Sequence, residues 1–324
     1  MIDKEIVFIA DRVPDHKDAS LSSRDLEKLA DRYFTSMMKS LAAITHSVTH
    51  YESPSEFLDH IAEHSDSVVL SLWSGEDSRN RRALVPSICE AYGIPYIGAD
   101  PYIQTICADK HLAKVFCQQY GIHTTRDVII SRSDDFPILK TLQYPAVVKP
   151  NFEGGSIGIM SKNLVDGYAE ATVLCTELLP LFHQLLVEEY AAGEELSVCI
   201  AGGEDQIDVF EVIRITVDGQ SYFTHEIYSA ETKKAGAASI KREIITERFP
   251  CEIRDKLLSL YKGLGKVDCI RIDGRFNNGI FTVIELTPDC NLSANGSMGK
   301  TFQCAGYTHE QMLQRLCENA LRHQ

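Results

Sequence analysis

A short apolar run that ends in lysine and is followed by small residues, at positions 144–158, is the feature that most constrains this chain. The run at 146–148 is rich in valine, as in a buried strand, and Lys149 closes it. The loop behind it holds three glycines and Ser156. Glycine lets backbone N–H groups approach an anion closely because it has no Cβ. The segment therefore predicts a polyphosphate site, although its spacing is neither that of a P-loop nor that of the dinucleotide fingerprint. A strand followed by a turn that binds nothing is the alternative.

Strands and helices alternate through the first hundred residues, which predicts a parallel sheet. With 324 residues, the chain is longer than one core usually supports, so two or three domains are expected. The expected strands lie at 5–10, 68–73 and 95–97, and the expected helices lie at 24–44, at 82–92 and from Ser53 onward.

The rest of the chain predicts a second, mostly antiparallel part. We expect helices at 102–120, 163–179, 251–264 and 309–322, and one more between the strands at 127–130 and 146–149. Further strands are expected at 157–161, 185–190, 195–201, 207–215, 221–228, 267–271 and 281–286. The small, polar stretch 229–241 predicts a mobile loop.

The composition excludes several classes of protein. A net charge of −14 argues against a general nucleic-acid binder, but ATP needs only local cations and a metal. No apolar stretch approaches the ~20 residues of a membrane span, and the N-terminus lacks the pattern of a secretory signal. The ten cysteines form no Cys-x-x-Cys pair and are expected to be reduced thiols. These features predict a cytoplasmic protein that binds neither membranes nor nucleic acids.

Two groups of charged residues follow apolar strands. Asp273 and Glu285 converge if their strands are neighbours, and two carboxylates are the usual anchor for Mg²⁺. Arg271 would then stabilise anionic charge close by, whereas a surface salt bridge is the alternative. Past the strand at 186–190, backbone groups are candidates for holding an adenine edge and Glu195 for holding ribose hydroxyls. A charged turn is the alternative there.

One apparent metal motif is rejected. His60 and His64 fit the pattern His-x-x-Glu-His. The apolar face of that helix consists of Phe57, Leu58 and Ile61, so we expect both histidines on the solvated side, with no third ligand.

Taken in order, these segments resemble the ATP-grasp superfamily, and within it the D-alanine–D-alanine ligase family. The similarity lies at Asp109-Lys110, at Val148-Lys149-Pro150 with the loop 153–158, at 188–191 with Glu195, at Arg271-Ile272-Asp273 and at Glu285. Glu76-Asp77 is similar to the family's Gly-Glu-Asp. The resemblance implies an α/β fold that is α+β in its ATP-binding part. It also implies an N-terminal domain at 1–101, a central domain at 102–190 and a C-terminal domain at 191–324.

The resemblance also implies roles for particular residues. ATP contacts are implied for Lys110, Lys149, Glu153, Gly155, Ser156, Glu188, Glu189, Tyr190, Ala191 and Glu195. Two Mg²⁺ ions are implied at Asp273 and Glu285, with Thr287 and Asp289 as further candidates, and catalytic roles at Arg271, Ser156 and Lys233. A homodimer that acts on small amino acids is implied as well.

The departures from the family concern the amino-acid substrate. Thr287 stands where the family has asparagine, Cys290-Asn291 where it has Pro-Gly, and Trp73 where it has histidine. The family's Lys-Tyr pair falls at Tyr228-Ser229, with Lys233 and Lys234 nearby. We therefore expect the substrate to contact Asp25, Trp73, Tyr228, Asn291 and Asn295.

Together these features predict an ATP-dependent carboxylate–amine ligase that works through an acyl phosphate. Two versions remain open: a D-alanine–D-alanine ligase, or a specialised biosynthetic relative that joins other amino acids or closes one into a ring. A regulatory protein that binds nucleotide without turnover is the alternative from another class. The changed position Thr287 favours it, and the retained arginine and metal carboxylates oppose it.

Overall fold

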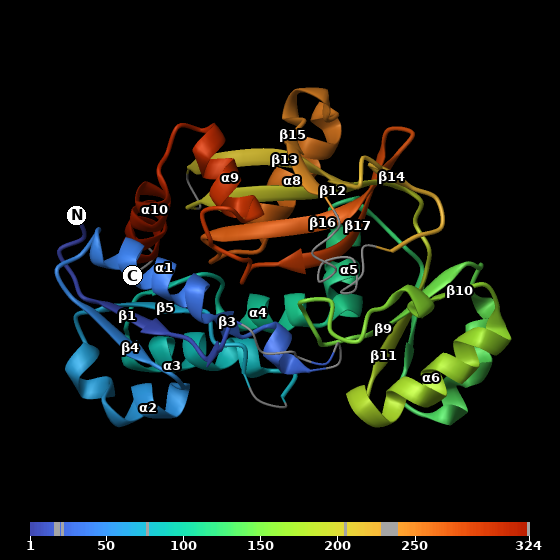
Figure 1. Ribbon diagram of the computed structural model, residues 1–324, viewed down its shortest axis with the longest axis horizontal. Helices are drawn as coiled ribbons and strands as arrows, with labels where there is room; N and C mark the ends of the chain where they lie inside the picture. The colour runs from blue at the N-terminus through green and yellow to red at the C-terminus, as the bar shows by residue number, and fades with distance from the viewer. Residues whose placement is uncertain (16–19, 21–22, 76–77, 204–205, 228–238, 323–324) are drawn as a thin grey trace.

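Three larger sheets organise the protein (Figure 1). The computed structural model describes residues 1–15, 20, 23–75, 78–203, 206–227 and 239–322. Tyr228, Lys233, Lys234 and Glu76-Asp77 lie outside the described residues, as does most of the expected loop 229–241.

The N-terminal sheet is parallel, as its alternating pattern predicts. Its order is β4-β1-β5-β6, with β1 at Ile6–Ile9, β4 at Val48–Tyr51, β5 at Val68–Ser71 and β6 at Tyr96–Ile97. All four residues of β1 are buried because helices cover both faces of the sheet. One face packs on α1 (Asp31–Ala42) and α10 (His309–Arg322), and the other on α2 (Pro54–Asp59) and α3 (Leu84–Tyr92).

The central sheet is small and antiparallel. It runs β10-β9-β11-β8, formed by Leu164–Val165, Ala146–Pro150, Leu185–Glu189 and Asp127–Ile130. Helix α6 (Tyr168–Phe182) covers one face of it, as Figure 1 shows on the right. The other face of this sheet carries side chains of the candidate site, which is described below.

The third sheet is the largest. It runs β15-β13-β12-β16-β17-β7, formed by Ile240–Ile244, Ile207–Val217, Gly193–Gly202, Cys269–Asn277, Ile280–Thr287 and His123–Thr124, and β14 (Tyr222–Phe223) pairs with β12. Helices α4 (Pro101–Ala108), α5 (Lys110–Gln119) and α8 (Cys251–Gly263) share a core with one face of it. Helices α9 (Ser297–Cys304) and α10 join the other face to the N-terminal sheet.

Short elements complete the fold. Strands β2 (Arg12–Val13) and β3 (Leu29–Ala30) pair in parallel, and 3₁₀ turns occupy Arg24–Leu26 (η1), Ile61–His64 (η2), Arg81–Ala83 (η3), Ser133–Thr141 (η4), Ser161–Asn163 (η5) and Thr246–Arg248 (η6). Within the described part of the chain, every helix is too short or too polar to cross a bilayer. All ten cysteines are free, and Cys251 and Cys304 are the exposed ones.

Several predicted elements differ from the observed ones. The helix expected at 24–44 is shortened to α1, because a 3₁₀ turn and β3 precede it. The helix expected at 102–120 breaks at Asp109, whose extended backbone places its carboxylate on the free N–H groups of His111 and Leu112. The strand expected at 157–161 is a turn, because Gly158 has a φ of +69°.

Further differences arise from packing. The expected helix before β9 consists of 3₁₀ turns, and the strand expected at 221–228 is limited to β14 in the described residues. Helix α9 was not expected at all. His64 is buried rather than solvated, because its ring nitrogens meet Tyr51 and Glu5 at 2.8 and 2.9 Å. Among the described residues, the structure shows no group of three potential metal ligands.

Candidate active site

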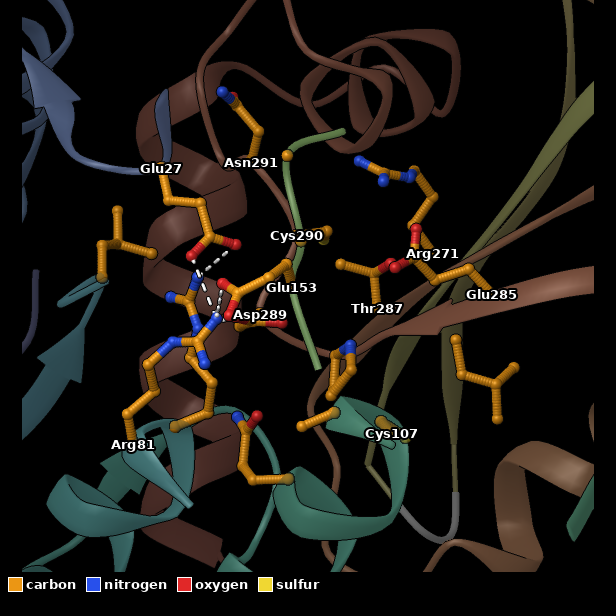
Figure 2. Close-up of a pocket in the computed structure, with 18 of the residues that line it drawn as sticks. Glu27, Arg81, Cys107, Glu153, Arg271, Glu285, Thr287, Asp289, Cys290 and Asn291 are labelled. Atoms are coloured by element: carbon orange, nitrogen blue, oxygen red, sulfur yellow. Dashed lines mark hydrogen bonds and ion pairs between the residues drawn. The ribbon is translucent and has the colours of Figure 1, made fainter. Parts of the chain in front are cut away.

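A cavity of about 240 Å³ opens where the N-terminal sheet, the glycine-rich loop and the end of β17 meet. Figure 2 shows charged side chains that line it. They come from the N-terminal part of the chain, from the loop after β9, and from β16, β17 and the segment that follows β17. The charged lining residues are Glu27, Arg81, Arg82, Lys110, Glu153, Arg271, Glu285 and Asp289. Charged groups that lie this close in a partly enclosed space act on one another strongly, because water screens them less than at a surface.

Lys110 enters this cavity from the first turn of α5. Asp109 caps that helix and thereby fixes the direction of the next residue. The Lys110 ammonium group donates to the carbonyl of Glu153 and lies 3.2 Å from Glu285 Oε1. It is buried, at 4% exposed. The lysine thus joins the glycine-rich loop to a carboxylate of the third sheet.

Lys149 lies at the end of β9 and does not stand alone. Its Nζ is 2.5 Å from Glu188 Oε1, and Lys114 donates to the other oxygen of the same carboxylate. Burial alone would raise the pKa of Glu188, but Lys114 and Lys149 outweigh it and hold that pKa at about 2. Lys114 also lies 3.8 Å from Asp127 Oδ1, so the two lysines and the two carboxylates of this group balance in formal charge. Lys114 was not predicted, although it lies one helical turn after Lys110.

Asp273 and Glu285 converge, as expected if their strands were neighbours. They are direct partners in the β16–β17 register, and Arg271 pairs with Thr287 two residues along. Arg271 Nε lies 3.0 and 2.9 Å from the two carboxylate oxygens of Asp273, and Ser197 donates to the same carboxylate at 2.6 Å.

The charges around Glu285 keep it ionised. Burial would raise its pKa, but Lys110, Lys149 and Arg271 outweigh the burial and lower it. Burial likewise opposes the charge of Arg271, and Asp273 reverses the effect, so the pKa of Arg271 lies above its ordinary value. Both groups therefore carry full charge at neutral pH.

The oxygen atoms at this corner fit a divalent cation of the Mg²⁺ type. Mg²⁺ is usually held by one or two carboxylates together with substrate phosphates, rather than by a full protein cage. Asp273 and Glu285 supply two carboxylates, and the buried Oγ1 of Thr287 has no hydrogen-bond partner among the described residues. A buried hydroxyl without a partner is costly, and a bound cation with its waters would satisfy it.

Asp289, a candidate metal ligand, lies apart from this corner and faces Arg82. Arg82 Nε is 3.1 Å from Asp289 Oδ2, and Arg82 also binds Glu27 at 3.0 Å. Burial would lower the pKa of Arg82, but Asp289 and Glu27 outweigh it and raise that pKa. Glu27, Arg81 and Arg82 were not predicted as site residues. Their partners lie far away in the sequence, so no local pattern identifies them.

The residues expected to hold adenine and ribose lie beside the end of β11. Glu189 accepts a hydrogen bond from the backbone N–H of Gln143 at 2.9 Å, and the Tyr190 hydroxyl donates to the carbonyl of Glu226 at 2.7 Å. Ala191 follows, half-buried. Glu195 lies 2.6 Å from Nε of Arg275, a buried residue that the sequence did not identify.

The remaining candidates divide between the cavity and other places. Gly155 and Asn291 line the cavity, and Gly155 has a φ of +58°. Ser156 belongs to the same loop, with a φ of +63°. The structure does not bring the other substrate candidates to the cavity: Asp25 is 3.0 Å from Lys28, Asn295 is exposed, and Trp73 lies in the N-terminal core beside a second pocket.

Comparison with known proteins agrees with this geometry. The family described as "D-ala D-ala ligase C-terminus" matches residues 118–318. A D-alanine–D-alanine ligase of Bacillus anthracis is 26% identical over 244 residues, which cover 74% of this chain and 75% of that protein. One from Clostridium botulinum is 25% identical over 239 residues, covering 73% and 76% of the two chains.

Solved structures show the same fold. The D-alanine–D-alanine ligase of Bacillus anthracis, complexed with ATP, superimposes with a TM-score of 0.73 at 19% identity, over 98% of both chains. The VanG D-Ala:D-Ser ligase of Enterococcus faecalis gives a TM-score of 0.69 at 17% identity, over 98% of this chain and 100% of the other. The fold is therefore that of the ATP-grasp ligases, as the sequence predicts. Because the family match covers more than half of its length, this chain belongs to the D-alanine–D-alanine ligase C-terminus family.

Proposed function

We propose that this protein is an ATP-dependent ligase that joins a carboxylate to an amine of amino-acid substrates, through an acyl phosphate, with release of ADP and phosphate. The observation that carries the proposal is the square formed by Arg271, Asp273, Glu285 and Thr287, with Lys110 beside it. A protein that only binds nucleotide needs no arginine and no paired carboxylates at one corner. Family membership supports the same conclusion.

In the first step, an oxygen of the substrate carboxylate attacks the γ-phosphorus of ATP. The bond between that phosphorus and the oxygen it shares with the β-phosphate breaks, and ADP leaves with the electron pair. Lys110 and Lys149 oppose the charge on the transferred group, and the glycine-rich loop contributes backbone N–H groups through Gly155 and Ser156. Positioning and charge stabilisation supply most of the catalysis in phosphoryl transfer.

Asp273 and Glu285 would hold Mg²⁺, with Thr287 as a further oxygen donor, and we propose two ions. When bound, such ions neutralise phosphate charge and orient the phosphates. The residues of this chain prepare the site, because Lys110 and Arg271 keep Glu285 ionised, and Arg271 and Ser197 orient Asp273. Asp289 is a weaker candidate than the others, since it lies apart from this corner and faces Arg82.

In the second step, the amine of the other substrate attacks the acyl carbon. A tetrahedral oxyanion forms, collapses and expels phosphate, and the amine loses a proton. Arg271 is placed to stabilise that oxyanion, because Asp273 holds its guanidinium group in position. Lys233 and Tyr228 lie outside the described residues and keep the catalytic and substrate roles proposed for them. Exclusion of water from the site would protect the acyl phosphate from hydrolysis.

ATP is proposed to lie between the central sheet and the third sheet. The backbone at 188–191 would hold the adenine edge, and Glu195 would accept hydrogen bonds from the ribose hydroxyls. We also propose that the protein consists of three domains, at 1–101, 102–190 and 191–324, and that it forms a homodimer.

Two versions of the substrate remain in the proposal. The matched relatives are named for ligating D-alanine to D-alanine or to D-serine. The cavity of this chain, however, has Arg82 and Asp289 paired across it, and Trp73 faces away. The departures at Thr287 and Cys290-Asn291 favour the specialised version.

The test is amino-acid-dependent release of ADP, with Mg-ATP and a panel of D- and L-amino acids supplied singly and in pairs. Release with D-alanine alone, with a dipeptide found by mass, would establish the D-alanine version. Release only with another acid or pair would name the specialised one. No release with any of them, from protein shown to bind ATP, would contradict the ligase proposal for these substrates.

A further inference from the structure

Six charged side chains connect the N-terminal part of the chain to the glycine-rich loop and to the segment after β17. We call them the arginine cluster: Arg24, Glu27, Arg81, Arg82, Glu153 and Asp289. Figure 2 shows Glu27, Arg81, Glu153 and Asp289 together at one end of the cavity. None of these contacts belongs to the phosphate or metal corner described above.

Arg81 makes the most contacts within this cluster. Its guanidinium group donates to Glu153 Oε2 at 3.0 Å, to the carbonyl of Phe152 at 3.1 Å and to Glu27 Oε2 at 3.3 Å. The guanidinium group also donates to the carbonyls of Ser74 and Ser78 at 3.0 and 3.2 Å, and these two bonds hold it against the N-terminal part of the chain. All three nitrogens are thus used, and the residue is 4% exposed. Such a planar fork fits several acceptors at once, which lysine cannot do.

The backbone of the glycine-rich loop packs closely against Glu27. A Cβ on Gly154 would lie 2.3 Å from Glu27 Oε1, and one on Gly155 would lie 3.2 Å from Glu27 Cγ. The loop therefore touches Glu27 with its backbone, while Glu153 at its start is held by Arg81 on one oxygen and by Arg24 on the other, at 2.9 Å.

We propose that Arg81 is a positioning residue that locks the glycine-rich loop, residues 152–158, closed over the cavity, with Glu27 as its second anchor. This inference rests on the proposed function, because it assigns to Arg81 the regulation of the same site. A closed loop excludes water from the acyl phosphate and holds backbone donors against the transferred phosphoryl group. Arg82 has a different role, since it binds Glu27 and Asp289 but no atom of the loop.

The loop contains its own reporters. The N–H of Ile157 donates to the carbonyl of Gly154 at 3.0 Å, and the N–H of Ile159 donates to the carbonyl of Ser156 at 3.1 Å. Amide hydrogen exchange at these two positions therefore reports how often the internal hydrogen bonds of the loop break, without any turnover. Amides of β9 in the same sheet report the stability of the surrounding fold.

The experiment compares the full-length protein with Arg81→Ala, Arg81→Lys and Arg82→Ala. Arg82→Ala is the matched control for exchange, because it removes a half-buried arginine from the same turn and keeps the bonds of Arg81 to the loop. Arg81→Ala should speed exchange at 157 and 159 about tenfold, which equals about 1.4 kcal/mol. The amides of β9 should stay unchanged, and Arg82→Ala should change the loop less than about twofold. Equal acceleration in the loop and in β9, or no acceleration at all, would overturn the proposal.

A second readout uses catalysis. In Arg81→Ala, the amount of ADP formed per ligated product should rise, since water reaches the acyl phosphate, and KM for ATP should rise more than kcat falls. Arg81→Lys should restore only part of both. Exposed Arg32 provides the activity control as Arg32→Ala. A wild-type protein without turnover would contradict the proposed ligase activity but not the exchange result, so the two failures are distinguishable. An unchanged ratio of ADP to product in Arg81→Ala would refute the locking role.

Discussion

Asp273 and Glu285 lie directly opposite each other across the β16–β17 pair. Opposite residues of an antiparallel pair project to the same face, and so do residues two apart on one strand. Arg271 and Thr287, the next opposite pair on that face, therefore complete a square of four side chains. Two carboxylates placed opposite each other repel. Arg271 and Lys110 offset this repulsion here, and a divalent cation would offset it further.

Replacing Asp273 with asparagine tests whether this square performs chemistry. We expect kcat for amino-acid-dependent ADP release to fall roughly 100-fold or more, because the charge that orients Arg271 and holds the metal is lost. Nucleotide binding, measured by calorimetry, should be partly retained. Glu243→Gln is the control, since Glu243 is an exposed partner of Arg214 far from the cavity. A variant that turns over at the wild-type rate would refute the assignment of Asp273.

Replacing Thr287 with valine separates stability from metal use. The Thr287 hydroxyl is buried and has no partner in the described part of the chain, so its removal should leave the free energy of unfolding of the ligand-free protein unchanged or slightly raised. The Mg²⁺ concentration for half-maximal activity should increase, because an oxygen donor is gone. Thermal unfolding without Mg²⁺ and a Mg²⁺ titration of activity provide the two measurements. A destabilised apo protein would show that the hydroxyl has a partner after all.

Much of the site follows from short segments of sequence. Lys110 begins α5 and Lys149 lies near the end of β9, whereas Arg271 and Asp273 lie inside β16 and Glu285 lies inside β17. Periodicity also predicted that β16 and β17 exist, and their adjacency brought the two carboxylates together. The two strands and the convergence of the carboxylates could be predicted because the determinants lie within a few residues of the side chains concerned, and the roles of these residues stay predictions.

The partners of those residues could not be predicted in the same way. Lys114 shares Glu188 with Lys149, and Arg275 pairs with Glu195, through contacts between segments that are distant in the sequence. Helix α9 was missed because its glycine and small residues give no clear apolar face. Trp73 was expected in the substrate site, but its large ring is buried in the N-terminal core. Hydrophobic burial decided its place rather than the strand-end position that suggested contact.

The paired lysines around Glu188 predict a specific dependence of stability on pH. The pKa of Glu188 is depressed to about 2, so its contribution is fully present above the unfolded-state pKa and is lost as the pH falls from about 4.5 toward 2. Its size is on the order of 3 kcal/mol from the depression of the pKa. Glu188→Gln should therefore be less stable than wild type at pH 7, and the gap should narrow below pH 4.5.

Urea unfolding at pH 7, 5 and 3.5 measures this gap. The control is Glu177→Gln, which removes an exposed carboxylate paired with Lys162. A gap of constant size across the three pH values would mean that the lysines do not hold Glu188 ionised in the folded state.

Glu195 and its neighbour Glu194 lie on opposite faces of β12 and allow a matched test of ribose binding. Glu194 pairs with Arg214 at 2.9 Å, whereas Glu195 pairs with the buried Arg275 at 2.6 Å beside the proposed nucleotide site. If Glu195 accepts a hydrogen bond from the ribose, wild type should prefer ATP over 2′-deoxy-ATP or 3′-deoxy-ATP in kcat/KM. Glu195→Gln should reduce that preference about tenfold, since a hydrogen bond to a charged group is worth about 1.5–3 kcal/mol. Glu194→Gln should keep the preference. An equal preference for ATP over the deoxy analogues in wild type and Glu195→Gln would show that Glu195 binds Arg275 and does not bind the ribose.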